Sequence, residues 1–325
     1  MRRKLLVLRH GKSDWSTGKQ DFDRPLVERG RLGAQRMAAW MQAQHLVPVH
    51  IVSSSAARAA ETAEAVCATI GLKLKDVRFD GRAYAAGVGE LLAALADSPK
   101  EAEAVMLVGH NPGLEELVQF LSEEPVAIPA DGKLLPTAAL ALLETDSEWA
   151  ALGARCARLI SVTRPAEVPE MFPTASGKEQ RTGKRPAYYY TQSAVIPYRL
   201  RNGVLEVLVI SSRKGKRWVV PKGVKEPELS PRESAAKEAF EEAGVRGKTG
   251  TAPLGTYDYE KWGGLCSVEV YPMEVHEVVE DALWEERYRS RKWVSVAEAG
   301  GLLDHPELRD MIGGLARSLG CGGGE

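Results

Sequence analysis

Four residues in the first half of the chain have side chains suited to phosphate chemistry and lie at the ends of predicted strands. Arg9 and His10 stand at the end of the first predicted strand. His110 follows another predicted strand, and Arg58 opens the helix after a third. Each residue taken singly is more typical of a packed or solvated position. As a set, they predict a site where guanidinium groups bind a tetrahedral dianion while an imidazole attacks phosphorus.

Three carboxylates in the second half have the spacing of neighbours on a helix. Glu238, Glu241 and Glu242 stand at i, i+3 and i+4, so their side chains share one face. Three negative charges repel one another unless a cation lies among them, and Lys237 lies off that face. Hard oxygen ligands select Mg²⁺ or Mn²⁺. The alternative is an acidic helix face in contact with solvent.

The elements predicted in the first half place its candidate residues at one edge of a sheet. They are strands at 4–9, 50–53 and 104–109 and helices at 30–44, 58–70, 91–96 and 114–121. Unbroken apolar strands that alternate with helices predict a parallel sheet covered on both faces. Ligands of such sheets bind outside the carboxyl ends of the strands. The class predicted for this half is α/β.

The second half has a different pattern, in which several strands surround one helix. The predicted strands are 189–198, 204–211, 218–220, 255–261 and 266–274. The helix is predicted over 231–243, because Ser230 can cap its start, Glu233 completes a capping box and Gly244 ends it. This half is therefore predicted to be α+β.

The length of 325 residues predicts two domains. A polar stretch with four prolines separates the two patterns and is too poor in apolar residues to form a core. We expect a first domain at 1–163, a linker at 164–186, a second domain at 187–319 and a glycine-rich tail at 320–325.

Composition excludes several classes of function. The 43 Lys and Arg residues nearly balance the 44 Asp and Glu residues, so the net charge of -1 favours neither polymeric nucleic acid nor a membrane surface. Four scattered cysteines predict neither a disulfide framework nor a zinc site. The short apolar run after the basic start is no signal peptide. We expect a cytoplasmic protein whose partners are small phosphorylated molecules; its oligomeric state is not predicted.

The first half resembles the histidine phosphatase superfamily, and within it the small SixA-like phosphohistidine phosphatases. The resemblance rests on four motifs in order: RHGKS at 9–13, DFDRPL at 21–26 with ERG at 28–30, SS at 53–54 with RAAETA at 58–63, and GHNPG at 109–113. It implies a three-layer αβα fold like that of phosphoglycerate mutase. His10 would accept the phosphoryl group, and Arg9, Arg58 and His110 would hold its oxygens without a metal.

The resemblance leaves the proton donor of this site open. Asp21 and Asp23 are candidates beside Arg24, itself a candidate for substrate binding; a solvated, capped loop is the equally weighted alternative for both aspartates. A phosphohistidine leaving group requires little acid assistance. On this hypothesis a phosphohistidine carrier protein becomes a further partner.

The second half resembles the Nudix hydrolases through their signature, Gx5Ex7REUxEExGU, in which U is aliphatic. The resemblance implies an αβα sandwich with a mixed sheet. The carbonyl of Gly223 with Glu238, Glu241 and Glu242 would hold Mg²⁺ (or Mn²⁺) on a diphosphate attacked by water. Glu241 is our candidate for the catalytic role.

This half departs from the signature at two positions. Leu229 replaces its first glutamate and Lys237 its arginine, which predicts an exchanged support of the loop and an intact set of carboxylates. Glu285 and Glu286 are alternative bases on a later loop, although we favour exposed charges there.

A basic set precedes the signature and consists of Arg213, Lys216, Arg217 and Lys222. Arg213 and Lys222 are candidates for binding further phosphates, with a charged turn as the equally weighted alternative. Segments 192–198 and 221–223 resemble the subgroup that includes diphosphoinositol-polyphosphate and diadenosine-polyphosphate hydrolases. We expect Tyr257, Tyr259 and Trp262 either to stack on a nucleobase or, as is more usual for strand aromatics, to belong to the core.

These observations predict a bifunctional phosphohydrolase. One half would act on a phosphomonoester or phosphohistidine, and the other on a nucleoside polyphosphate, a dinucleoside polyphosphate or an inositol pyrophosphate. The two sites would act in sequence or independently. The alternative is that one half, more readily the second with its two departures, is a non-catalytic sensor that regulates the other.

Overall fold

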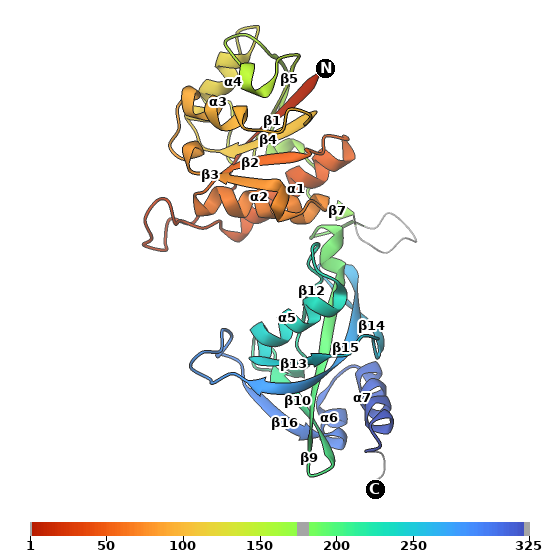
Figure 1. Cartoon of the computed structure of the whole chain (residues 1–325). Coiled ribbons are helices and arrows are strands. Elements are labelled where there is room, and N and C mark those ends of the chain that lie inside the picture. Colours follow the sequence, from red (N-terminus) through yellow and green to blue (C-terminus); the bar gives the residue numbers. More distant parts are fainter. Residues whose placement is uncertain (1, 174–181, 322–325) are drawn as a thin grey trace. The chain divides into compact units, whose positions relative to one another are not determined.

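The computed structural model describes residues 2–173 and 182–321. The chain divides into two compact units, Met1–Phe172 and Pro173–Glu325, which Figure 1 shows in red to green and in green to blue. Each unit has its own sheet and is described by itself.

The sheet of the first unit has six strands in the order β3-β2-β4-β1-β5-β6. The strands are β1 (Arg3–Arg9), β2 (His50–Ser54), β3 (Val77–Asp80), β4 (Ala104–Gly109), β5 (Leu140–Thr145) and β6 (Arg158–Thr163). β1 to β4 are parallel, as predicted, whereas β5 and β6 are antiparallel to their neighbours. The strands predicted from the sequence are parallel as expected, but the expected sheet was incomplete: β5 and β6 were not predicted, and they add an antiparallel part after α4 and a long irregular segment.

Helices cover both faces of this sheet (Figure 1). They are α1 (Glu28–Ala43), α2 (Ala57–Ile70), α3 (Val88–Ala96) and α4 (Gly113–Leu121). Leu6 and Leu8 of β1 are buried in the apolar cluster of α1 and α2, whereas Leu5 and Val7 join the cluster of α3 and α4. Successive side chains of a strand point to opposite faces, so an unbroken apolar strand needs both layers. The three-layer αβα architecture is confirmed.

Short 3₁₀ helices complete the described elements. They are η1 (Leu74–Asp76), η2 (Gly81–Ala83), η3 (Trp149–Ala151) and η4 (Pro165–Glu167) in the first unit and η5 (Ala187–Tyr190) in the second.

The beginning of the expected linker packs against the first unit. The guanidinium of Arg36 in α1 donates hydrogen bonds to the carbonyls of Pro165, Val168 and Pro169. Val168 is buried in the cluster of α1 and α2. The first unit thus extends through residues that the prolines led us to place in the linker.

Two further strands, β7 (Phe172–Pro173) and β8 (Thr182–Gly183), flank the undescribed segment. Residues 174–181 of the expected linker and 322–325 of the expected tail lie outside the described residues.

The sheet of the second unit is mixed and runs β11-β10-β9-β15-β13, with β12 on β9, β14 on β15 and β16 on β10. The strands are β9 (Thr191–Arg201), β10 (Val204–Ser211), β11 (Trp218–Val219), β12 (Lys222–Val224), β13 (Val245–Thr249), β14 (Gly255–Lys261), β15 (Gly264–Val278) and β16 (Arg291–Ser295). β9 and β15 are parallel, and the other described pairs are antiparallel. The mixed sheet is confirmed.

Helices cover this sheet on both faces as well. α5 (Pro231–Ala243) packs through Ala235 and Ala239 on one face, and α6 (Val296–Leu302) and α7 (Pro306–Ser318) pack on the other. The predicted bounds of α5 are confirmed, including the Ser230 capping box and a left-handed Gly244 after its end. In the described part of the chain, no helix is long and apolar enough to span a membrane.

Candidate active sites

The sheet of the first unit brings His10 and His110 side by side. β1 and β4 are parallel neighbours in which Arg9 pairs with Gly109, so each histidine follows its strand at the same level. The His10 amide donates to the carbonyl of Gly109, and the two imidazole centroids are 5.0 Å apart. Both side chains therefore lie at the edge where ligands of parallel sheets bind.

Arg58 reaches the same edge from α2, which follows β2. Its Nε lies 3.3 Å from Nε2 of His10, and the guanidinium is buried. The structure therefore joins three of the four residues that strand and helix ends singled out, and the charge of the fourth, Arg9, acts on both histidines.

The hydrogen bonds of His10 place its lone pair on Nε2, which accepts a long hydrogen bond of 3.3 Å from Nε of Arg58. Nδ1 lies 2.7 Å from the carbonyl oxygen of Gly11, which can only accept, so Nδ1 carries the proton and the neutral ring has its lone pair on Nε2. Burial, supported by the charge of Arg58, lowers the pKa of His10 to about 4 despite the opposing bond to Gly11. The imidazole is neutral at pH 7.

Close backbone packing explains the glycine that follows His10. A Cβ on Gly11 would lie 2.5 Å from the carbonyl oxygen of Gly30 at the start of α1. The Gly11 amide donates to Oγ1 of Thr62, which itself donates to the carbonyl of Arg58. Three of the sequence motifs are thus in direct contact, and the contact places His10.

His110 faces His10 and is positioned by a serine at the end of β2. Its Nε2 is 2.9 Å from Oγ of Ser54, which also accepts a hydrogen bond from the Ala56 amide. Nδ1 of His110 is buried without a partner among the described residues. Burial, with the neighbouring His10 and Arg58, lowers the pKa of His110 to about 3. This imidazole is also neutral at pH 7.

The site holds more buried donors than the described protein uses. Arg9 donates from Nη1 to the carbonyl of Leu135, and Arg24 donates from Nη2 to Asp21. Within the described residues, Nε of Arg9 and both Nε and Nη1 of Arg24 are buried without an acceptor. Buried donors are normally satisfied, so these three nitrogens indicate a site for an anion. Burial lowers the pKa of Arg9 and outweighs the opposing effect of the Glu115 charge.

The two aspartates considered as proton donors lie in different surroundings. Asp21 accepts from Arg24, from Arg58 and from the Tyr84 hydroxyl. Burial alone raises its pKa, but the bonds from Tyr84 and Arg58 and the arginine charges outweigh burial and lower it. Both aspartates are exposed, but Asp21 is a carboxylate that orients two arginines.

Sequence reasoning missed Tyr84 in this site. Its ring lies edge-on to His110 at 5.5 Å and its hydroxyl holds Asp21. The residue sits after η2, outside every recognised motif, so no sequence signal identified it. Ser54 lies within a recognised motif, but only the structure reveals its contact with His110.

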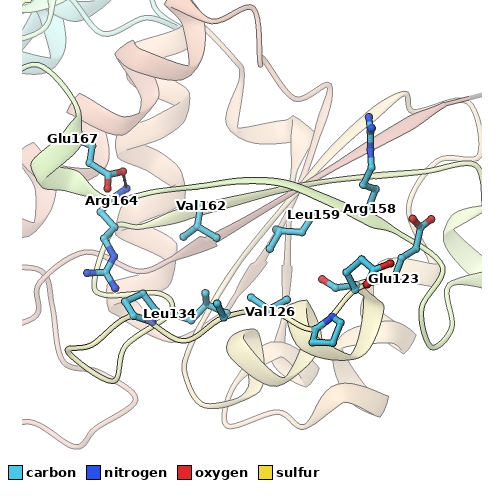
Figure 2. Close-up of a pocket in the computed structure, with 13 residues that line it drawn as sticks. Glu123, Val126, Leu134, Arg158, Leu159, Val162, Arg164 and Glu167 are labelled. Atoms are coloured by element: carbon cyan, nitrogen blue, oxygen red, sulfur yellow. Dashed lines mark hydrogen bonds between the residues drawn. The ribbon is translucent and has the colours of Figure 1, made fainter.

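A separate cleft of about 650 Å³ lies along β6 in the same unit. Figure 2 shows Leu159 and Val162 of β6 facing Val126 and Leu134 of the segment after α4. None of the residues considered above lines this cleft, so it is distinct from the histidine site.

In the second unit, the helix face with three glutamates lies against the turn at β12. Gly223 contacts Glu238 so closely that a Cβ there would lie 1.7 Å from Oε1 of the carboxylate. Glycine at this position leaves the space that the Glu238 carboxylate occupies.

The Glu242 carboxylate accepts hydrogen bonds from two neighbours, a backbone amide and a guanidinium. Its Oε2 accepts from the backbone amide of Lys222 at 2.9 Å, and its Oε1 accepts from the buried Arg289 guanidinium at 2.5 Å. Arg289 also binds Glu286 through Nε. Glu286 thus joins the site through Arg289, contrary to the exposed charge that we favoured, while Glu285 is exposed. Arg289 was not predicted from the sequence, because it lies in a loop outside every recognised motif.

The donor chemistry of this face fits a divalent cation. Burial, with the charges of Glu242 and Glu241, raises the pKa of Glu238 to about 8. Burial also raises the pKa of Glu242. These two half-buried carboxylates resist ionisation because burial disfavours their charged forms, and a cation bound between them would stabilise the charge. In the described ranges, however, no three acidic, histidine or cysteine side chains converge as a metal cluster.

The third glutamate faces a cation of its own helix. Glu241 lies 3.6 Å from Nζ of Lys237, which also pairs with Glu226. Glu226 precedes α5 in the loop where the family signature carries its first glutamate at position 229. The predicted exchange of support for Leu229 thus has a structural counterpart, the Lys237–Glu226 pair.

The predicted basic set divides in the structure. Lys222 lies inside the site, and its Nζ donates to the Tyr259 hydroxyl at 3.2 Å. Arg213 and Lys216 lie on an exposed turn, and Arg217 pairs with Asp304. Lys222 thus lies where it could bind a substrate phosphate. Arg213 instead lies on an exposed, charged turn, which was the alternative interpretation.

The aromatic candidates divide similarly. Tyr257 is buried in the core beside α7, whereas Tyr259 is half-buried beneath Lys222 and donates to Gln192. Trp262 lies in the turn between β14 and β15, and its backbone carbonyl accepts a hydrogen bond from the Tyr190 hydroxyl.

The chain matches two families of known proteins. Residues 5–82 match the histidine phosphatase superfamily (branch 1), and residues 190–312 match the NUDIX domain. Nudix hydrolase 16, mitochondrial, of Arabidopsis thaliana is 36% identical over 155 residues, 41% of this chain and 84% of the relative. Diphosphoinositol polyphosphate phosphohydrolase 3-beta of Bos taurus is 37% identical over 117 residues, 35% of this chain and 69% of the relative.

Solved structures resemble each half of the chain. A protein histidine phosphatase SixA complexed with tungstate is 21% identical, with a TM-score of 0.43, over 50% of this chain and 97% of that one. An Ap4A hydrolase of C. elegans is 20% identical, with a TM-score of 0.34, over 40% of this chain and 97% of that one.

Proposed function

We propose that this chain, which belongs to the Nudix hydrolases through its second unit and carries a histidine phosphatase domain in its first, is a phosphohydrolase with one active site in each unit. Both domains belong to hydrolase families. The observation that carries the proposal for the first unit is the neutral His10, with its lone pair on Nε2, among buried arginine donors without acceptors.

In the first unit, Nε2 of His10 attacks phosphorus and forms an N–P bond. The bond between phosphorus and the leaving group breaks, and the leaving group departs with the electron pair and takes a proton from water. Arg9, Arg24 and Arg58 offer donors to the phosphoryl oxygens, and His110 offers its buried Nδ1. Water then hydrolyses the N–P bond, which releases phosphate and restores the lone pair. The substrates are phosphomonoesters or phosphohistidine.

In the second unit, Glu238, Glu241, Glu242 and the Gly223 carbonyl would hold Mg²⁺ or Mn²⁺. A bound cation there supplies charge neutralisation to a diphosphate under attack by water. Arg289 orients Glu242, and the Lys222 ammonium, whose pKa is lowered by burial, lies ready for a substrate oxygen. The name of the bovine relative supports an inositol pyrophosphate as the substrate. Nucleoside and dinucleoside polyphosphates are the other substrate classes that we propose to test.

Phosphate release from phosphomonoesters and diphosphates tests the proposal in the wild type, His10→Ala and Glu241→Gln, with and without Mg²⁺. We expect His10→Ala to remove only the metal-independent activity and Glu241→Gln to reduce only the metal-dependent one. His45→Ala and Glu260→Gln, both at exposed positions, are the matched controls. Turnover by Glu241→Gln equal to the wild type on every diphosphate would favour the alternative, a second unit that only senses its ligand.

A further inference from the structure

A half-buried glutamate closes a ring of hydrogen bonds beside the histidine site. Glu115 lies in the first turn of α4, and its Oε1 accepts from the amide of Leu135 at 2.8 Å and from Nδ2 of Asn111 at 2.7 Å. Nδ2 of Asn111 also donates to the carbonyl of Leu135 at 3.0 Å. Three hydrogen bonds thus join the start of α4 to a segment about 20 residues further along the chain.

This ring fixes the carbonyl that binds Arg9. Nη1 of Arg9 donates to the Leu135 carbonyl at 2.8 Å, and Nε of Arg9 is buried without an acceptor among the described residues. Burial above all, and to a smaller extent the charge of Arg9, lowers the pKa of His10 and of His110, so the guanidinium lies close to both imidazoles. The hydrogen bond to Leu135 therefore determines where the unused Nε of Arg9 points.

Leu135 depends on these side chains because its segment is irregular. Between residues 123 and 139 the chain forms neither a helix nor a strand, so no ladder of backbone hydrogen bonds orients its peptide groups. The Leu135 side chain is buried in the core, and buried backbone groups require hydrogen-bond partners. Glu115 satisfies the amide of Leu135, and Asn111 satisfies its carbonyl together with Arg9.

The next residue of α4 provides a contrast on the same turn. Glu116 is exposed, and its carboxylate has no hydrogen bond or ion pair among the described residues. Both Glu115 and Glu116 lie at the positive end of the helix dipole, where each stabilises α4 to a similar extent. They differ in that only the Glu115 carboxylate is connected to Arg9, through Leu135.

We propose that Glu115 is a positioning residue of the first unit: it holds the Leu135 peptide group and thereby orients Arg9 toward a phosphoryl oxygen. This inference rests on the proposed phosphatase function and adds a residue to that site. A negative charge near the site by itself weakens the binding of an anion. Charge and position therefore predict opposite results when the Glu115 carboxylate is removed.

Binding of inorganic phosphate separates the two effects without turnover. Calorimetry at pH 7 with chelator compares the wild type with Glu115→Ala and Glu115→Gln, and Glu116→Ala is the matched control. We expect Glu115→Ala to weaken phosphate binding about tenfold, the order of one hydrogen bond to a charged group. Glu115→Gln should bind within about threefold of the wild type, because its amide oxygen can accept both hydrogen bonds. Tighter or unchanged binding by Glu115→Ala would overturn the inference, since only the charge of Glu115 would then matter.

A double-mutant cycle tests whether Glu115 acts through Arg9. In the Arg9→Ala background, Glu115→Ala should weaken phosphate binding by less than about twofold, because the guanidinium that it orients is absent. If Arg9→Ala binds too weakly to measure, the cycle uses Arg9→Lys, whose ammonium lacks the planar set of donors. A further tenfold loss in this background would contradict the inference, because a general loss of structure would lower the affinity whether or not the guanidinium is present.

Hydrolysis of phenyl phosphate by His10→Ala tests the phosphatase function separately. If that variant hydrolyses the ester at the wild-type rate, the proposed function fails. The phosphate affinities of the Glu115 variants still decide whether Glu115 orients Arg9, so the two failures are distinguishable.

Discussion

The candidate sites of the two units have opposite charge arrangements. The first unit buries arginines and keeps its two histidines neutral, with pKa values of about 4 and 3. The second unit buries carboxylates and raises the pKa of Glu238 to about 8. Burial disfavours the charged form in both cases. On the proposed function, the first site binds an anion directly and the second first requires a cation. The near-zero net charge of the chain conceals this contrast.

The contrast also concerns how rigidly each site is built. Backbone contacts between Gly11 and Gly30 and the hydrogen bonds of Thr62 fix the nucleophile in the first unit. In the second unit, Glu242 depends on Arg289, which reaches it from a loop. We therefore expect the first site to be preorganised and the second to gain its final arrangement with a cation.

The largest expected effect breaks the first site alone. Arg58→Lys removes the planar donor set that reaches both His10 and Asp21, and one ammonium cannot replace it. We expect kcat/KM of the metal-independent activity to fall about 100-fold, which corresponds to about 2.7 kcal/mol, with the metal-dependent activity unchanged. Arg158→Lys, at an exposed ion pair of the same unit, is the control. Retention of activity by Arg58→Lys would contradict the role of the guanidinium.

Gly11→Ala tests the backbone contact that places His10. The added Cβ collides with the carbonyl of Gly30, so we expect the first unit to lose about 1–3 kcal/mol of stability. Thermal unfolding followed by calorimetry measures the loss. Gly81→Ala is the control, since no atom lies within 4 Å of its added Cβ. Equal melting temperatures for the two variants would refute the packing argument.

Glu238→Gln tests the cost of burying an ionised Glu238 carboxylate without a bound cation. The folded pKa of about 8 exceeds the ordinary 4.5, so the folded state keeps a proton that the unfolded state has lost. Stability therefore falls as pH rises between these values, and the fall ends above the folded pKa. At pH 8 with chelator, we expect the variant to be more stable by about 1 kcal/mol, or about 2–4 °C in Tm.

When metal is present, we expect the wild type to become the more stable of the two proteins. Mg²⁺ should raise the Tm of the wild type at pH 8 and leave Glu238→Gln nearly unchanged. Equal responses of the two proteins to Mg²⁺ would mean that Glu238 does not hold the cation.

The smallest expected effect concerns the exchanged support of the second loop. Lys237→Met removes the partly exposed pair with Glu226, and such pairs contribute about 0–1 kcal/mol. We expect a change in Tm of less than 2 °C and at most a fewfold loss of metal-dependent activity. Lys237→Arg should retain wild-type values. A loss like that of Glu241→Gln would show that Lys237 does more than support the loop.

Sequence reasoning succeeded where local signals coincide with strand ends. His10, His110 and Arg58 were expected at one edge because parallel strands end together, and the structure places them within contact of one another. The bounds of α5 were predictable because Ser230, Glu233 and Gly244 mark both ends.

Sequence reasoning failed where position depends on tertiary contacts. Tyr84 and Arg289 sit in irregular segments whose approach to the sites depends on packing over long sequence separations. β5 was missed because it follows a long irregular segment after α4, and its antiparallel pairing with β1 depends on tertiary contacts. Pro165 and Pro169 indicated a linker, but their carbonyls bind α1 through Arg36.

The central claim is that one chain holds two phosphate sites with opposite requirements for metal. The most direct measurement follows hydrolysis of phenyl phosphate and of a dinucleoside polyphosphate by the intact chain while divalent cations are removed with a chelator and then restored as Mg²⁺. The account predicts that the first activity stays constant and the second disappears and returns. Loss of both activities, or of neither, would contradict it.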